Sequence, residues 1–373
     1  MTSIGGAEMV DWNLAVATAT RLVRPGPEVS RDEARAVVAE LRRHAKASEQ
    51  HVRGFTRMGT DDIHDTPILV VDRPGWVRAN VAGFREVLKP LLDKMQERRS
   101  NTPGGAVFGA VGGKVTGVEL GMLLSFLSSR VLGQYETFAP ASRELPAGAK
   151  GGRLLLVAPN IVHVERELDV EPHDFRLWVC LHEETHRTQF TAVPWLRDHL
   201  EGEIQSFLGE TEVDPMTVLE RIREAAQSLA GGRPEGEEDD EGRSLVEIVQ
   251  TPAQREILGR LTAVMSLLEG HADFVMDGVG PDVVPSVAEI REKFQQRRAK
   301  GASRLDSALR KLLGLDAKLR QYRDGERFVR AVVEQVGMDG FNRVWTSPNT
   351  LPTKTEIAKP ADWVARVHRK AES

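Results

Sequence analysis

The sequence feature that most constrains this chain is the pattern His-Glu-x-x-His at residues 182–186. Residues four apart on an α-helix share a face, so the imidazoles of His182 and His186 can bind one metal ion. Neutral imidazole is a preferred ligand of Zn²⁺, and Glu183 is placed to reach a water on that metal. The pattern therefore predicts a helix, a zinc site and a general base within a few residues.

The residues around the pattern favour a buried helix. Asp174 is the expected N-cap, and no Pro or Gly follows it until Pro194. The run from Phe175 to Leu181 is apolar nearly all round, as expected for a helix inside a core. The alternative interpretation is that His182 and His186 are core residues bonded to neighbouring carbonyls, with no metal.

Catalytic zinc normally has three protein ligands, and the third is expected far downstream. Glu269 and Asp273 are one helical turn apart, so one carboxylate can bind the metal while the other fixes a ligand histidine through its second ring nitrogen. Glu269 is the preferred candidate. Three other residues could replace it, namely His199, Glu203 and His271.

A His-Glu-x-x-His helix followed by a Glu-x-x-x-Asp helix resembles the gluzincin arrangement. Residues 181–190, 269–280 and 321–363 more closely resemble an uncharacterised family of zincin-like hydrolases, often labelled as associated with the biosynthesis of a deazaflavin coenzyme. This resemblance covers most of the chain. It implies a mainly α (α+β), zincin-like metalloprotease fold with a small β-sheet and a helical N-terminal part. It also implies Zn²⁺ as cofactor, with His182, His186 and Glu269 as ligands, Glu183 as general base and Asp273 as the partner of His182.

The predicted function is zinc-dependent hydrolysis of peptide or amide bonds, in which Glu183 takes a proton from a metal-activated water. Tyr322 and His271 are candidates to stabilise the oxyanion. The expected substrate is peptide-like or a small amide. The alternative is a non-catalytic metal-binding scaffold or interaction protein of zincin fold, which Glu183 disfavours because a structural zinc site needs no base.

Charge, hydropathy and cysteine content limit the kinds of partner and the cellular compartment that we expect for this chain. A formal net charge of -5 argues against a general nucleic-acid binder. The apolar run 118–132 contains Glu119 and Arg130, and the interval between them is too short to span a bilayer. The first ten residues lack the character of a signal peptide, and a single cysteine cannot form an internal disulfide. We therefore expect a cytoplasmic protein that binds neither nucleic acid nor membrane.

The remaining sequence predicts helices and one clear strand. Residues 1–100 are expected to form the helical N-terminal part and residues 101–373 the zincin-like part, together one compact unit. The acidic segment 231–243 is expected to be a mobile loop. Residues 153–157 are a short apolar run that predicts a strand. Zincins have an edge strand that can pair with an extended substrate, so this strand has either that role or an ordinary place in the sheet.

Overall fold

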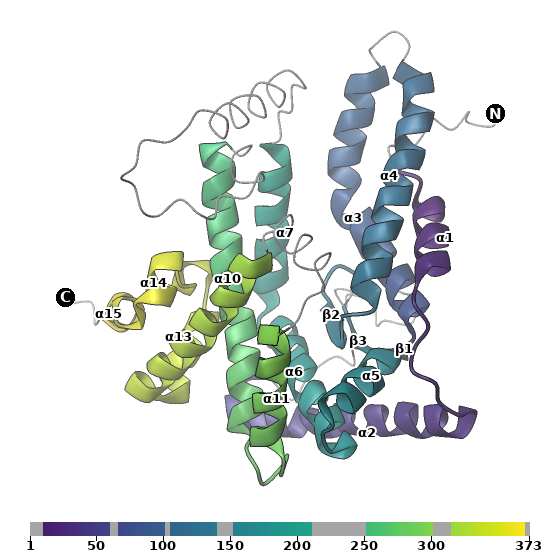
Figure 1. The fold of residues 1–373 in the computed structure, drawn as a ribbon. Helices are drawn as coiled ribbons and strands as arrows, with labels where there is room; N and C mark the ends of the chain where they lie inside the picture. The colour runs from purple at the N-terminus through teal and green to yellow at the C-terminus, as the bar shows by residue number, and fades with distance from the viewer. Residues whose placement is uncertain are drawn as a thin grey trace, which may run out of the picture. The chain divides into compact units, whose positions relative to one another are not determined.

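The computed structural model describes residues 10–59, 66–100, 105–139, 152–210, 251–300 and 315–369. The predicted acidic loop at 231–243 lies outside these residues. The described chain is mostly helical with one three-stranded sheet, which confirms the predicted mainly α fold with a small sheet (Figure 1). No helix within the described ranges has the length and apolar character needed to cross a membrane.

The chain divides into two compact units. The first comprises Met1–Arg197 and Val275–Arg297, and the second comprises Asp198–Phe274 and Arg298–Ser373. These units are clusters of packed residues, so the boundary near residue 100 and the single compact unit stay predictions.

The elements of the first unit surround the sheet. Its helices are α1 (Trp12–Leu22), α2 (Arg31–Thr56), α3 (Arg73–Ser100), α4 (Gly105–Ser128), α5 (Ala158–Leu168), α6 (Pro172–Ala192) and most of α11 (Val287–Lys300). Its strands are β1 (Ile68–Val71), β2 (Gly133–Glu136) and β3 (Arg153–Val157). The start of α7 (Pro194–Gly209) and the end of α10 (Pro252–Gly278) also belong to it.

The predicted strand at residues 153–157 is confirmed as β3, which is the central strand of the sheet. The order is β1-β3-β2, with β1 parallel and β2 antiparallel to β3. Both edges of β3 are thus occupied, so the suggested pairing of this strand with an extended substrate is wrong. The antiparallel edge strand is β2.

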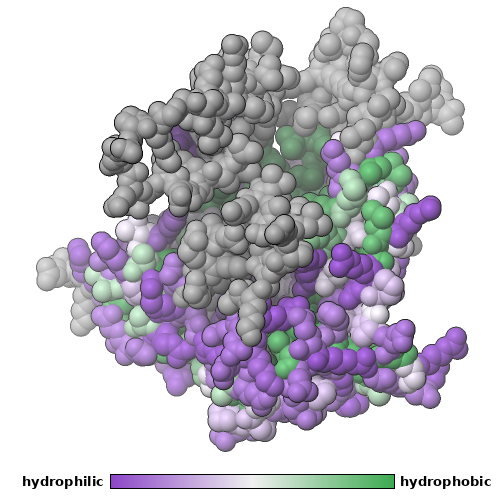
Figure 2. Space-filling view, in the orientation of Figure 1, coloured by the Kyte–Doolittle hydropathy of each residue, from purple (hydrophilic) through white to green (hydrophobic). Residues whose placement is uncertain are grey.

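Side chains of β3 alternate between two apolar cores, as the two-residue period of a strand requires. Leu155 and Val157 pack with α1, α3 and α4, whereas Leu156 packs with α2, α5 and α6. Figure 2 shows apolar residues along α1 and α4 amid a largely hydrophilic surface. The exposed large apolar side chains of these helices are Leu22, Val118, Met122 and Leu123.

The helix α6 is buried nearly all round, as predicted, because α2, α5 and the ends of α10 and α11 contribute to the same core. Its start differs from the prediction. Pro172 occupies the first turn, where its missing N–H costs nothing, and Glu171 is the N-cap. Asp174 is instead buried and accepts hydrogen bonds from the backbone N–H and the hydroxyl of Ser286, at 2.8 and 2.7 Å.

The second unit is helical in its described residues. It contains most of α7 and α10, the helices α13 (Leu315–Phe341), α14 (Lys354–Ala358) and α15 (Pro360–His368), and the 3-10 turns η1 (Asn342–Trp345) and η2 (Pro348–Thr350). The backbones of α10 and α13 meet at Gly270 and Gly325. A methyl group added at Gly325 would lie 1.9 Å from the carbonyl oxygen of Ser266, so only glycine fits there.

Candidate metal centre

Two histidines of α6 converge as the pattern predicts. Nε2 of His182 lies 3.2 Å from Nε2 of His186, and both side chains are half-buried. Two nitrogens bound tetrahedrally to one Zn²⁺, each at about 2.0–2.1 Å, would lie about 3.3 Å apart. The two donor atoms therefore have the spacing that a shared zinc ion requires.

A third residue of α6 orients His186. Nδ1 of His186 lies 3.0 Å from Oε1 of Gln189, a fully buried side chain one turn further along the helix. An Nδ1–H that donates to this oxygen leaves the lone pair on Nε2, the atom that faces His182. Gln189 was not among the predicted site residues, although its position three residues after His186 would have suggested this bond.

The predicted base lies against the edge strand of the sheet. Glu183 is buried, with 6% of its surface exposed. A methyl group added at Gly133 of β2 would lie 2.5 Å from Cγ, 2.6 Å from Cδ and 2.8 Å from Oε1 of Glu183. Glycine at this position leaves the room that the carboxylate occupies. No local pattern in the sequence links Gly133 to Glu183, which lies 50 residues later.

The opposite face of α6 holds a buried ion-pair network. Nε of Arg187 donates to both carboxylate oxygens of Glu184, at 3.0 and 2.8 Å, and its Nη2 donates to Glu49 of α2 at 2.8 Å. Burial raises the pKa of Glu184 to about 7, even though Arg187 acts to lower it. These bonds fix α6 against α2 and hence fix the direction in which the two histidines point.

The other predicted site residues belong to the second unit. Glu269, His271 and Asp273 lie on α10, so their roles at a site with His182 and His186 stay predictions. Within its own unit, His271 is fully buried and its ring stacks on Phe341, with centroids 5.3 Å apart. Tyr322 belongs to α13, and its side chain lies outside the described ones.

The alternative ligands His199 and Glu203 lie on α7. The carboxylate of Glu203 accepts hydrogen bonds from Nε of Arg260 at 3.1 and 3.0 Å. Both of its oxygens are therefore engaged by the guanidinium of Arg260.

Comparison with known proteins gives one family and one solved structure of the same fold. The model of a family described as zincin-like metallopeptidase matches residues 10–364. The chain is also similar to a crystal structure of a candidate hydrolase with a novel fold from Chloroflexus aurantiacus, at 30% identity and a TM-score of 0.68. That match covers 97% of this chain and 100% of the other. The search of curated proteins finds no match.

Proposed function

The chain belongs to the zincin-like metallopeptidase family, and on this basis we propose that it is a zinc-dependent hydrolase of peptide or amide bonds. The observation that carries the proposal is the convergence of Nε2 of His182 and His186 beside the buried Glu183. Two imidazoles and a carboxylate on one helix are the parts that activation of water for acyl transfer needs.

The proposed zinc ligands are His182, His186 and Glu269, each a half-buried side chain that offers one donor atom. Glu269 is proposed because it lies on α10 in the Glu-x-x-x-Asp pattern that supplies the third ligand in the gluzincin arrangement. Asp273 is the proposed partner of the second ring nitrogen of His182.

A bound Zn²⁺ supplies Lewis acidity, which polarises the substrate carbonyl and lowers the pKa of a water molecule. In the proposed mechanism Glu183 accepts the proton of the attacking water and later donates it to the leaving amine. His271 and Tyr322 stay the proposed oxyanion-stabilising residues. Glu183 lies against Gly133 on a face of β2, and β2 is an edge strand, so an extended peptide that pairs with β2 would lie one strand away from the base.

The proposed substrate is a peptide-like molecule or a small amide, in the cytoplasm, with neither nucleic acid nor membrane as a partner. Main-chain pairing with an edge strand favours peptide-like ligands, because it uses the backbone groups that every peptide has. A non-catalytic zincin-fold scaffold would have no use for a base at Glu183, which favours the enzyme.

The test combines metal content with hydrolysis of a peptide library by the full chain. We expect His182→Ala, His186→Ala and Glu269→Ala each to lose or weaken one equivalent of zinc relative to the parent. Glu183→Gln should retain that zinc and cleave about 10²–10⁴-fold more slowly. A Glu183→Gln protein that cleaves at the parental rate would contradict the proposed mechanism. Zinc at the site with no cleavage by the parent would favour the scaffold.

A further inference from the structure

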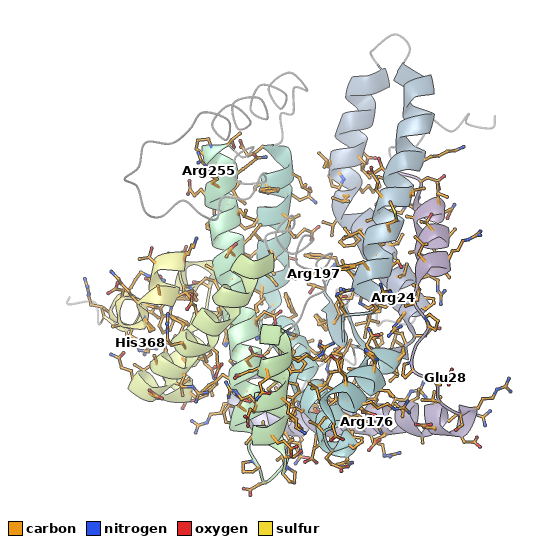
Figure 3. All side chains as sticks on the ribbon, viewed as in Figure 1. Arg24, Glu28, Arg176, Arg197, Arg255 and His368 are labelled. Atoms are coloured by element: carbon orange, nitrogen blue, oxygen red, sulfur yellow. The ribbon has the colours of Figure 1, made fainter. Side chains whose placement is uncertain are left out.

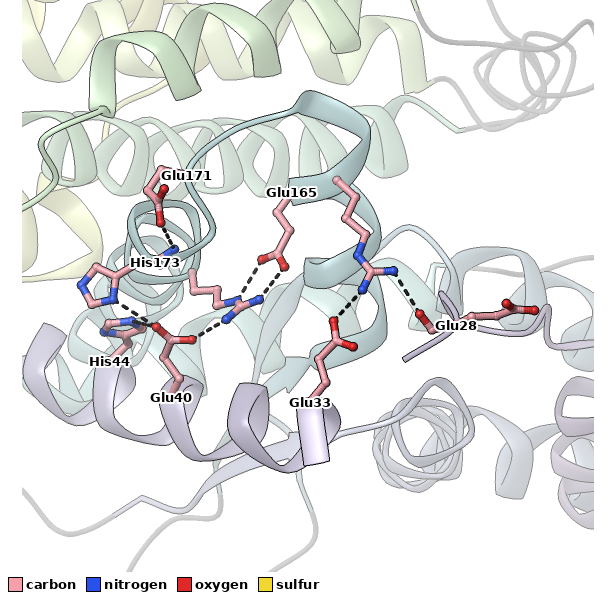
Figure 4. Close-up of polar contacts among 9 residues, drawn as sticks. Glu28, Glu33, Glu40, His44, Glu165, Glu171 and His173 are labelled. Atoms are coloured by element: carbon pink, nitrogen blue, oxygen red, sulfur yellow. Dashed lines mark hydrogen bonds and ion pairs between the residues drawn. The ribbon is translucent and has the colours of Figure 1, made fainter. Parts of the chain in front are cut away.

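A second group of metal-ligating side chains lies where α2 meets the first turn of α6 (Figure 4). It consists of Glu40 and His44, one turn apart on α2, and His173 of α6. Oε1 of Glu40 lies 3.4 Å from Nε2 of His44 and 3.0 Å from Nδ1 of His173. One ligand atom from each of the three residues lies within 4.8 Å of the other two.

His44 supplies an independent sign that a ligand belongs in this group. Its side chain is buried, with 7% of the residue exposed, and its Nε2 makes no hydrogen bond in the described part of the chain, although it points at Glu40. Buried ring nitrogens are nearly always hydrogen-bonded or bound to a metal. Burial also lowers the pKa of His44, and the neutral ring is the form that binds metals.

Charged side chains of both signs surround the group and leave one oxygen of Glu40 facing the two histidines. Arg176, labelled in Figure 3, lies between the carboxylates of Glu40 and Glu165 and donates hydrogen bonds to both. Glu171 caps α6 beside His173, and the charge of Arg43 of α2 also acts on His44. Arg176 binds Oε2 of Glu40, so Oε1 is the oxygen that faces both imidazoles and could bind a metal with them.

We propose that Glu40, His44 and His173 bind a divalent transition-metal ion, Zn²⁺ by the preference of two imidazoles and one carboxylate. This site is separate from that of His182. His173 precedes His182 by nine residues, or two and a half helical turns, which places them about 13.5 Å apart along the axis and on opposite faces of α6. The metal would tie α2 to α6. His173 is exposed, which gives an ion access from solvent.

The experiment uses the full chain with His182→Ala and His186→Ala, which removes both histidines of the first site. Purified, metal-free protein is titrated with Zn²⁺ by calorimetry and with Co²⁺ by visible absorption, whose d–d bands report the geometry of bound imidazole and carboxylate. We expect one equivalent of metal to bind, and we expect a rise in Tm when Zn²⁺ is added.

The discriminating variant adds His173→Ala, which removes an exposed side chain and leaves the core unchanged. We expect it to weaken binding more than tenfold and to abolish both the Co²⁺ bands and the rise in Tm. The matched control adds His163→Ala instead, because His163 is also exposed and also faces a glutamate one turn away, Glu167 at 3.9 Å. Binding should survive in this control.

Two results would overturn the proposal. One is that the protein lacking His182 and His186 binds neither Zn²⁺ nor Co²⁺, which would make the group at His173 an ion-pair network alone. The other is that His173→Ala binds metal as His163→Ala does. Neither result bears on the hydrolase proposal, because the first site is absent from all of these proteins.

Discussion

Replacement of Gly133 by alanine tests whether the position of Glu183 matters for the reaction. The backbone of Gly133 is not in the left-handed region, so alanine brings no conformational strain. Its methyl group would start 2.5 Å from Cγ of Glu183, whereas ordinary contacts begin at 3.4 Å. The side chain of Glu183 must therefore retreat by about 0.9 Å. A displacement of about 1 Å at a reacting group can cost about 10²-fold in rate, or roughly 2.7 kcal/mol of transition-state stabilisation.

The assay is kcat/KM on the best substrate from the peptide library, with zinc content measured in parallel. Zinc should be unchanged, because Gly133 faces the base and supplies no ligand. Gly54→Ala is the matched control: this exposed residue of α2 has no atom within 4 Å of the added methyl group and should keep full activity. If Gly133 acts only through Glu183, adding Gly133→Ala to Glu183→Gln should cause little further loss. Parental kcat/KM in Gly133→Ala, or a full additional loss in the double variant, would refute the reasoning.

Three further predictions concern other parts of the chain. Gln189→Leu should weaken zinc binding about 10–100-fold, measured by competition with a chelator, while the circular dichroism of the helices is unchanged. Gly325→Ala should destabilise the protein by at least about 1–3 kcal/mol in urea unfolding, because the new methyl group would overlap the backbone at Ser266. Burial raises the pKa of Glu356, but hydrogen bonds from Arg366 and Thr353 and the charge of Arg366 together outweigh burial, so the pKa is lowered from its usual value of 4.5. The stability that ionised Glu356 contributes is thus present above pH 4.5 and lost as the pH falls through its lowered pKa. The drop in Tm on acidification should be smaller in Glu356→Gln than in the parent.

Local patterns predicted those parts of the fold that local interactions determine. Ser30 caps α2 by accepting a hydrogen bond from the backbone N–H of Glu33, a contact between residues only three apart in the sequence. Both faces of β3 are buried, and this explains why the strand has the continuous apolar run from which it was predicted. Its central place was not predictable, since the flanking strands β1 and β2 have only four residues each and β2 begins with glycine. The order of strands depends on packing between distant segments.

The contrast between local and long-range contacts also separates the predicted parts of the site from the parts that were not predicted. The spacing of His182 and His186 on one helix is a local property, so their convergence followed from the sequence. Gly133 contacts Glu183 only because β2 packs beside α6, and no spacing rule connects residues on a strand and on a later helix. In the second group, the proximity of Glu40 and His44 is predictable because they are one helical turn apart on α2. The contact of His173 with Glu40 is not predictable from spacing, because His173 lies on α6.

The two faces of α6 present different polar groups, which have different parts in the proposed site. On one face the buried charge of Glu184 is matched by Arg187, which is itself shared with Glu49, so the network is complete within the protein. On the other face the bond to Gln189 directs the lone pair of His186 toward Nε2 of His182, 3.2 Å away. A hydrogen on Nε2 of His182, or a bound cation, would satisfy that lone pair. The ion pairs therefore hold α6 in place, and they fix the position from which the two histidines would bind the proposed metal.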